Sequence, residues 1–115
     1  MTEKAGAVYA SRSNEETIMG AFGTPDTSKT ETITTAAASA AVTGLLVEKW
    51  YRVVCTKDTH VHFHATEDAT TSHMFMLAGV PEIFYTGILT RVAVIQNSAA
   101  GTVFLTPMMT NDRNA

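Results

Sequence analysis

Residues 50–65 read WYRVVCTKDTHVHFHA, which is two β-rich runs separated by the polar turn Thr56-Lys57-Asp58-Thr59. The second run alternates an apolar face with a histidine face, formed by Val61, Phe63 and Ala65 and by His60, His62 and His64. Such alternation is typical of a strand, because successive strand side chains point to opposite faces of a sheet. The first run extends back to Leu45, and we predict that the two runs, residues 45–55 and 60–65, are neighbouring strands of a β-hairpin.

The chain beyond residue 65 continues as short β runs separated by turn-forming residues. Four further runs lie at residues 72–77, 82–86, 91–96 and 102–106. A spacing of about ten residues between runs is typical of an antiparallel sandwich. Together with one or two strands before residue 36, these runs predict an all-β fold, a small antiparallel β-sandwich of about seven or eight strands.

The N-terminal third is more polar and extended. Residues 29–35 (KTETITT) are rich in β-branched side chains and predict a short strand. Residues 36–41 (AAASAA) favour a helix but are too few to form a stable one alone, so we interpret them as a connector. Either residues 24–41 lie along another subunit, or they fold back and complete their own sandwich. We divide this single domain into an N-terminal arm with the first strands, a sandwich body and a frayed tail, at residues 1–35, 36–110 and 111–115.

Composition excludes several classes of protein. The chain has 115 residues, 45% of them hydrophobic and 17% charged, and its formal net charge is −3. An acidic chain without a basic run is unsuited to binding nucleic acid, so we expect no such partner. No run approaches the roughly 20 apolar residues of a membrane helix, and the first residues lack the pattern of a signal peptide. We expect synthesis in the cytoplasm and no membrane partner.

The three alternating histidines raise the question of a metal site. His62 and His64 stand on one strand face, and Glu67 follows closely enough to add an oxygen ligand. The pattern differs from the metal motif of cupins, which has a longer spacing to the glutamate and a second motif near the C-terminus. We therefore expect no bound metal or other cofactor, and interpret the histidines as a solvated or subunit-contacting face. A metalloenzyme using His62, His64 and Glu67 is the weaker alternative.

Nucleophilic catalysis has little support in the sequence. Cys55 is the single cysteine, and it lies in an apolar run where a thiol is usually a small buried hydrophobe. The serines and carboxylates show no catalytic spacing, so we expect a protein without enzymatic activity and without catalytic residues. The aromatic residues are spread over several β runs, as in a core. A carbohydrate-binding module with an exposed aromatic platform remains a second hypothesis.

Five segments together resemble small structural proteins of tailed bacteriophages, the head cement or decoration proteins. They are residues 50–56 (WYRVVCT), 60–63 (HVHF), 69–72 (ATTS), 77–82 (LAGVPE) and 92–102 (VAVIQNSAAGT). The resemblance covers residues 45–107. It implies a jelly-roll-like sandwich that binds the outside of the assembled capsid and stabilises the junctions between major capsid subunits. A tail- or fibre-associated β module of the virion is the alternative within the same class.

The resemblance also implies partners and a location. We expect the major capsid protein as partner, a homo-oligomer with a trimer ahead of a dimer, and a place on the capsid surface of a virion assembled in the bacterial cytoplasm. The contact surface that we predict joins the histidine face to the preceding strand, through Trp50, Arg52, His60, His62 and His64. Because an imidazole titrates near pH 6.5, a histidine contact would also weaken assembly in acid.

Overall fold

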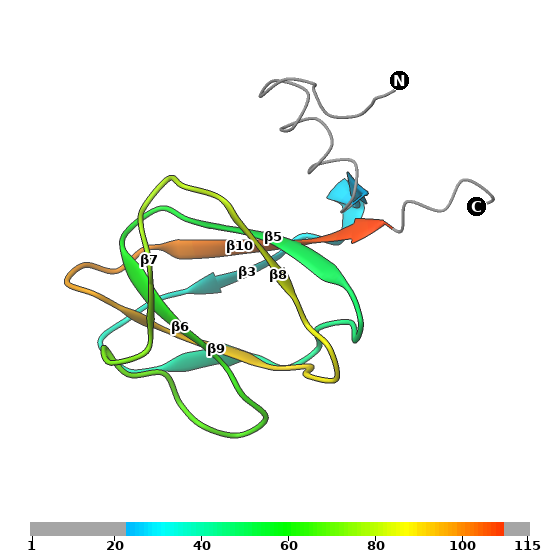
Figure 1. The fold of residues 1–115 in the computed structure, drawn as a ribbon. Helices are drawn as coiled ribbons and strands as arrows, with labels where there is room; N and C mark the ends of the chain where they lie inside the picture. Colours follow the sequence, from blue (N-terminus) through cyan, green and yellow to red (C-terminus); the bar gives the residue numbers. More distant parts are fainter. Residues whose placement is uncertain (1–22, 110–115) are drawn as a thin grey trace, which may run out of the picture.

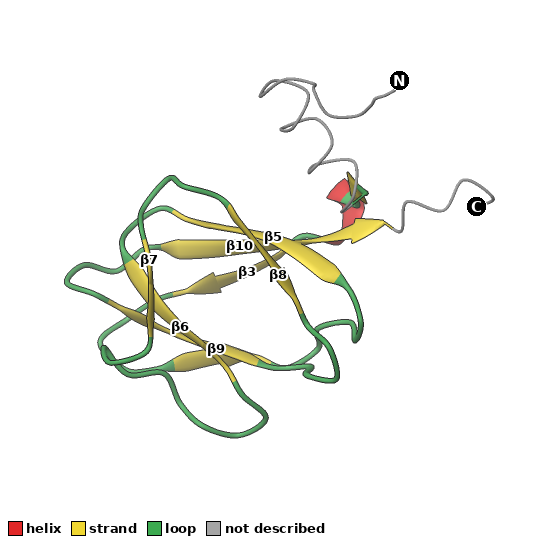
Figure 2. Cartoon of the chain, in the orientation of Figure 1, coloured by secondary structure: helices red, strands yellow, loops and turns green. Residues whose placement is uncertain are grey.

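The computed structural model describes residues 23–109, and this part of the chain is built almost entirely of strands (Figures 1 and 2). In chain order its elements are β2 (Thr24–Pro25), the short 3-10 helix η1 (Thr27–Lys29), β3 (Glu31–Thr34), β4 (Ala40–Val42), β5 (Trp50–Cys55), β6 (Thr59–Phe63), β7 (Met74–Met76), β8 (Glu82–Tyr85), β9 (Val92–Gln96) and β10 (Thr102–Met109). The expectation of an all-β fold is confirmed.

The strands form two antiparallel sheets that face each other (Figure 1). The first sheet has the order β3-β10-β5-β8, with β2 extending the β3 edge against the end of β10. The second has the order β4-β9-β6-β7. Eight strands divided between two sheets in this order make a jelly roll, one of the double-sheet solutions to the problem of unpaired strand edges. The eight strands, with β2 as a short addition, agree with the number expected from the sequence.

The core lies between the sheets and takes one face of each. From the first sheet it receives Tyr51, Val53, Cys55, Val103 and Leu105, and from the second Val61, Met76, Val92 and Val94. Burial alternates along β5 as the two-residue period of a strand requires. Apolar packing between two sheets is therefore the main source of stability, since Cys55 has no other cysteine with which to form a disulfide.

The predicted hairpin of residues 45–65 is wrong. β5 pairs with β10 and β8, whereas β6 pairs with β9 and β7 in the opposite sheet. The turn between them crosses the sandwich: the Thr56 amide still donates to the carbonyl of Thr102, the first residue of β10, and the Asp58 carbonyl already accepts from the amide of Asn97, just after β9. Instead, β6 forms a hairpin with β7 in the second sheet, and residues 64–73 connect these two strands.

Residues 24–41 fold back onto their own sandwich. Residues 31–34 pair with residues 102–105 of β10, and residues 40–42 pair with residues 92–94 of β9. The predicted strand at residues 29–35 is confirmed as β3, and the alanine-rich run ends in an edge strand where small side chains suffice. β2 and β3 thus belong to the first sheet, while residues 1–22 and the tail at 111–115 lie outside the described residues. Among the described residues no helix has the length and hydropathy to cross a membrane.

A core truncation tests this packing. Leu105 lies in the middle of β10 and is 1% exposed, so Leu105→Ala should lower the free energy of unfolding by about 2–5 kcal/mol through lost burial and a residual cavity. Leu46→Ala removes the same atoms from a side chain that is 45% exposed. It should change the free energy of unfolding by less than about 1 kcal/mol. Urea unfolding followed by Trp50 fluorescence measures both, and equal losses would contradict the assigned core.

Candidate functional site

His60 links neighbouring segments of the second sheet through hydrogen bonds of its ring. Its imidazole is 7% exposed, donates from Nδ1 to the carbonyl of His73 at 2.9 Å, and places Nε2 2.9 Å from Oδ1 of Asn97. Its ring also meets Phe75 edge-on, with centroids 5.5 Å apart. Both ring nitrogens are therefore engaged within the chain, and His60 is not available as part of an exposed contact face.

His62, His64 and His73 form an imidazole stack on the outside of the same sheet. The His62 ring lies nearly parallel to His73, with centroids 3.7 Å apart, and 5.1 Å from His64. Glu67 closes the group: its Oε1 accepts from Nε2 of His62 at 3.0 Å and lies 3.8 Å from Nε2 of His64. The hydrogen bond from His62, with the neighbouring His64, holds the pKa of Glu67 below its usual value.

The Nδ1 atoms of His64 and His73 indicate which tautomers these two residues adopt. Nδ1 of His64 accepts the amide hydrogens of Thr66 and Glu67, at 3.1 and 2.9 Å. Nδ1 of His73 likewise accepts from the amide of Thr70 at 2.9 Å. A neutral imidazole that accepts at Nδ1 carries its proton on Nε2. His62 and His64 therefore turn N–H groups, and not lone pairs, toward Glu67.

This arrangement does not fit a metal ion. The ligand atoms of His62, His64 and Glu67 all lie within 4.8 Å of one another, which meets the first requirement of a site. A metal-binding imidazole, however, presents a bare nitrogen to the ion and donates its other N–H to an acceptor. His64 does the reverse, and His62 already uses Nε2 as a donor to Glu67.

The stack instead fastens the long loop of residues 64–73 to the sandwich. Arg91, just before β9, holds the same loop: its guanidinium donates to the carbonyls of His64 and Glu67 and lies 3.3 Å from the Asp68 carboxylate. The hydroxyl oxygen of Ser39 also accepts a hydrogen bond from the amide of Ala69 at 2.9 Å. The conspicuous histidines and their acidic neighbours are thus used to order a surface loop.

The pH dependence of stability tests the contact between Glu67 and the histidines. A carboxyl whose pKa is lower in the folded chain stabilises it above the unfolded value, here 4.5, and this contribution is lost as the pH falls through the folded value. Glu67→Gln should therefore lower the melting temperature at pH 6 to 7, and the difference from the parent protein should shrink as the pH falls below 4.5. Glu48→Gln, in another loop, is the control. A pH-independent difference would contradict the assignment.

Trp50 and Arg52 lie on the outside of the opposite sheet. They alternate with buried Tyr51 and Val53 along β5, and they pair with Tyr85 and Ile83 of β8. The single contact surface predicted from Trp50, Arg52, His60, His62 and His64 is therefore wrong, because β5 and β6 belong to different sheets. Trp50 instead packs against Tyr85, with ring centroids 4.9 Å apart.

Cys55 is a core residue, as the sequence predicts. It is 1% exposed, and its sulfur lies 3.7 and 3.6 Å from the carbonyl oxygens of Met76 and Leu77. Burial raises the pKa of the Cys55 thiol, which keeps it protonated near neutral pH. A buried thiol that stays protonated has neither the access nor the charge of a nucleophile.

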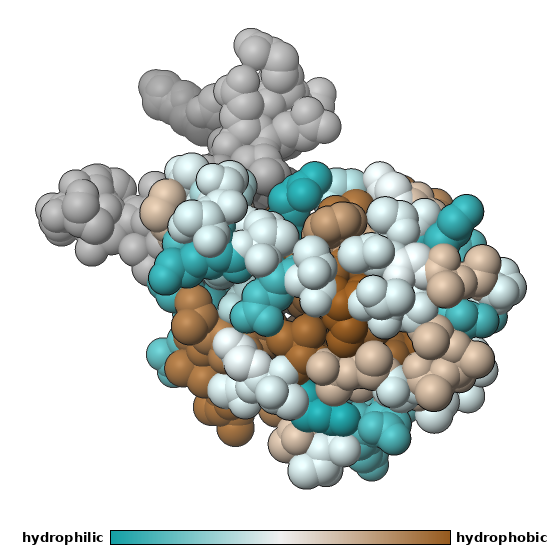
Figure 3. Space-filling model, turned by 180° about the vertical axis from the view of Figure 1, so that it is seen from behind, coloured by the Kyte–Doolittle hydropathy of each residue, from teal (hydrophilic) through white to brown (hydrophobic). Residues whose placement is uncertain are grey.

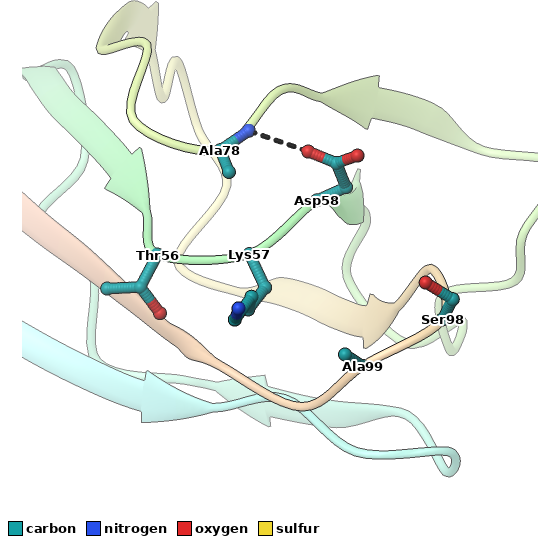
Figure 4. Close-up of a pocket in the computed structure, with 6 residues that line it drawn as sticks. All are labelled: Thr56, Lys57, Asp58, Ala78, Ser98 and Ala99. Atoms are coloured by element: carbon teal, nitrogen blue, oxygen red, sulfur yellow. Dashed lines mark hydrogen bonds between the residues drawn. The ribbon is translucent and has the colours of Figure 1, made fainter.

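One end of the sandwich carries a shallow hollow of about 360 Å³, shown in Figure 4. It is lined by residues of three sheet-crossing turns: Thr56, Lys57, Asp58, Ala78, Ser98 and Ala99. Asp58 is committed to the fold, since its Oδ1 accepts from the amide of Ala78 at 2.8 Å. No aromatic ring lines the hollow, so it offers no platform on which a sugar ring could stack.

Two exposed apolar surfaces were not predicted from the sequence. The first, which we call the β7 edge, consists of Met74, Phe75, Leu77 and Val80, each 43–52% exposed. The second, the apolar end, lies opposite the hollow and consists of Leu46, Val47, Tyr85, Ile88 and Met109. Figure 3 shows apolar atoms gathered at its lower left, where the loops before β5 and after β8 meet. The run Leu45-Leu46-Val47 is a sequence signal for the second surface, but the same run is equally typical of the start of a strand.

The comparisons with known proteins add no relative: no protein-family model, curated protein or solved structure matches this chain.

Proposed function

We propose that this protein is a non-enzymatic structural protein of a tailed-phage virion that binds the outside of the assembled capsid and stabilises the junctions between major capsid subunits. The observation that carries the proposal is the β7 edge. β7 is a three-residue edge strand; its Met74 and Phe75 are 43 and 45% exposed, and Leu77, which follows it directly, is 52% exposed. Edge strands are usually protected by charge, proline or a covering segment, so an apolar edge favours a protein that works against a partner.

The use of polar groups supports the same proposal. His60, the imidazole stack and Arg91 engage in contacts that order loops, and Cys55 is closed off in the core. A jelly roll by itself does not specify a function, since viral capsid proteins, lectins and cupins share this architecture. The resemblance of residues 45–107 to head decoration proteins selects among these classes.

Capsid stabilisation requires many interfaces of modest affinity and not one interface of high affinity. Each copy contributes a small contact at one of many equivalent junctions, and rupture of the shell requires several contacts to fail together. A short apolar edge is suited to such a contact. We propose further that the protein acts as a homo-oligomer, a trimer ahead of a dimer, assembled in the reducing bacterial cytoplasm where a free Cys55 is stable.

Co-sedimentation with empty, expanded shells of the phage that encodes the chain tests this proposal. The parent protein should bind at a saturating, fixed ratio to capsid subunits, and Leu77→Ser should weaken binding by about tenfold by removing an apolar contact of roughly 1–2 kcal/mol. Ile88→Ser is the matched control, because it makes a similar change in an exposed apolar residue at the other end of the sandwich. No binding by the parent protein, or equal losses in both variants, would contradict the proposal.

The pair of Trp50 and Tyr85 favours one other function, carbohydrate binding. Its two rings pack on the outer face of the first sheet, and Tyr85 is 50% exposed, which gives a sugar ring an aromatic surface to contact. This hypothesis predicts saturable quenching of Trp50 fluorescence by bacterial surface glycans, abolished in Tyr85→Ala. Our proposal predicts no quenching in either protein.

A further inference from the structure

Two histidines hold the loop between β6 and β7 through lone pairs that exist only in neutral imidazoles. Nδ1 of His64 accepts the amide hydrogens of Thr66 and Glu67, at 3.1 and 2.9 Å. Nδ1 of His73 accepts the amide hydrogen of Thr70 at 2.9 Å. A protonated imidazole carries a hydrogen on both nitrogens and accepts at neither. The order of this loop therefore requires that both rings be uncharged.

Protonation of these two rings replaces hydrogen bonds by contacts between donors. In the charged form the N–H at Nδ1 faces the amide N–H groups that the lone pair now binds, and those amides lose their acceptor. A ring charge on His73 also meets the ring of His62, whose centroid lies 3.7 Å away, so charges on both repel. Because an imidazole ordinarily gains its proton near pH 6.5, the change falls between pH 5 and 8.

The charged groups beside these rings offset this change only in part. Glu67 faces the rings, but its Oε1 already accepts from His62 at 3.0 Å, and its side chain is 62% exposed, so water screens its attraction for a further charge. Asp68 lies 3.3 Å from the guanidinium of Arg91, and that positive charge disfavours additional cations at this place.

The loop ends on the strand that carries the β7 edge. His73 directly precedes Met74, the first residue of β7, and its carbonyl accepts from Nδ1 of His60 at 2.9 Å. Nε2 of His60 lies against Oδ1 of Asn97, so both of its ring nitrogens face oxygen atoms and its protonation breaks neither contact. Acid therefore acts on the loop and on the entry into β7, while the main-chain pairing of β7 with β6 stays in place.

We propose that residues 64–73 are a pH-sensitive switch: neutral His64 and His73 hold the loop in its ordered form, and their protonation releases it and loosens the entry into the β7 edge. Arg91 and Ser39 hold the middle of the loop through main-chain groups that do not titrate, so the release is local and the sandwich stays folded. The consequence for binding rests on the proposed function: attachment through the β7 edge weakens in acid, because a partner must then order this segment at a cost in entropy.

Amide hydrogen exchange of the full-length protein, corrected for the intrinsic rate at each pH, tests the switch. The protection factors of residues 66, 67 and 70 should fall by about tenfold between pH 7.5 and pH 5.0, which lie on either side of the ordinary imidazole titration. Those of residues 92–96 in β9 should stay within about twofold. Unchanged protection at residues 66, 67 and 70, or an equal fall in β9, would overturn the proposal.

His64→Asn is the matched variant, because an asparagine Oδ1 accepts from amides two and three residues ahead and does not titrate. It should keep residues 66 and 67 protected at pH 5.0, while residue 70, bonded to the unchanged His73, stays sensitive to acid. Acid sensitivity of residues 66 and 67 that persists in His64→Asn would assign the effect to another group and overturn the switch. The titration of the parent protein decides the proposal independently of this variant.

Co-sedimentation with empty phage shells at the same two pH values distinguishes the switch from the proposed function. The parent protein should bind about fivefold more weakly at pH 5.0, and His64→Asn should lose a smaller factor on the same shells, which corrects for effects of acid on the shells themselves. Equal losses in the two proteins would overturn the effect of the switch on binding. Absence of binding at both pH values would contradict the proposed function, and hydrogen exchange in the free protein would still decide whether the loop is a switch.

Discussion

Strand β10 is the element on which the first sheet depends, because it is hydrogen-bonded along both of its edges. β5 lies on one side, and β3 and β2 lie on the other, so the beginning and the end of the described chain meet on one strand. Its Val103 and Leu105 also supply the centre of the core. These contacts join residues far apart in the sequence, and the jelly roll therefore closes only when its last strand is in place.

The crossing of the chain between sheets determines where every candidate residue lies. Trp50 and His60 are close in sequence, yet the turn after β5 sends them to outer faces on opposite sides of the sandwich. The same crossings place three turns around the hollow and two loops around the apolar end, so the two ends differ in chemistry. One end is polar, with Asp58 bonded to the main chain, and the other is apolar.

The sequence predicts the strands better than their partners, for a physical reason. Alternation in residues 60–65 and burial along 50–55 follow from the two-residue period of a strand, which is a local property. The turn at residues 56–59 looks the same whether the chain returns in its own sheet or crosses to the other one. The outward orientation of His60 follows from this period. Its burial by Phe75 and Asn97 depends instead on β7 and on the turn after β9. The exposure of Ile88 depends on left-handed turns at Glu48 and Gly87, and a non-glycine residue such as Glu48 gives no local sign of one.

The proposed function depends on one contact, that of the apolar β7 edge with a partner. Hydrogen exchange measures that contact most directly, because no strand within residues 23–109 pairs with the outer edge of β7. The amides of residues 74–80 should become protected when the protein is bound to empty phage shells, while those of residues 86–90 keep their rates. Unchanged exchange along residues 74–80 in the bound protein, or protection confined to residues 86–90, would contradict the account.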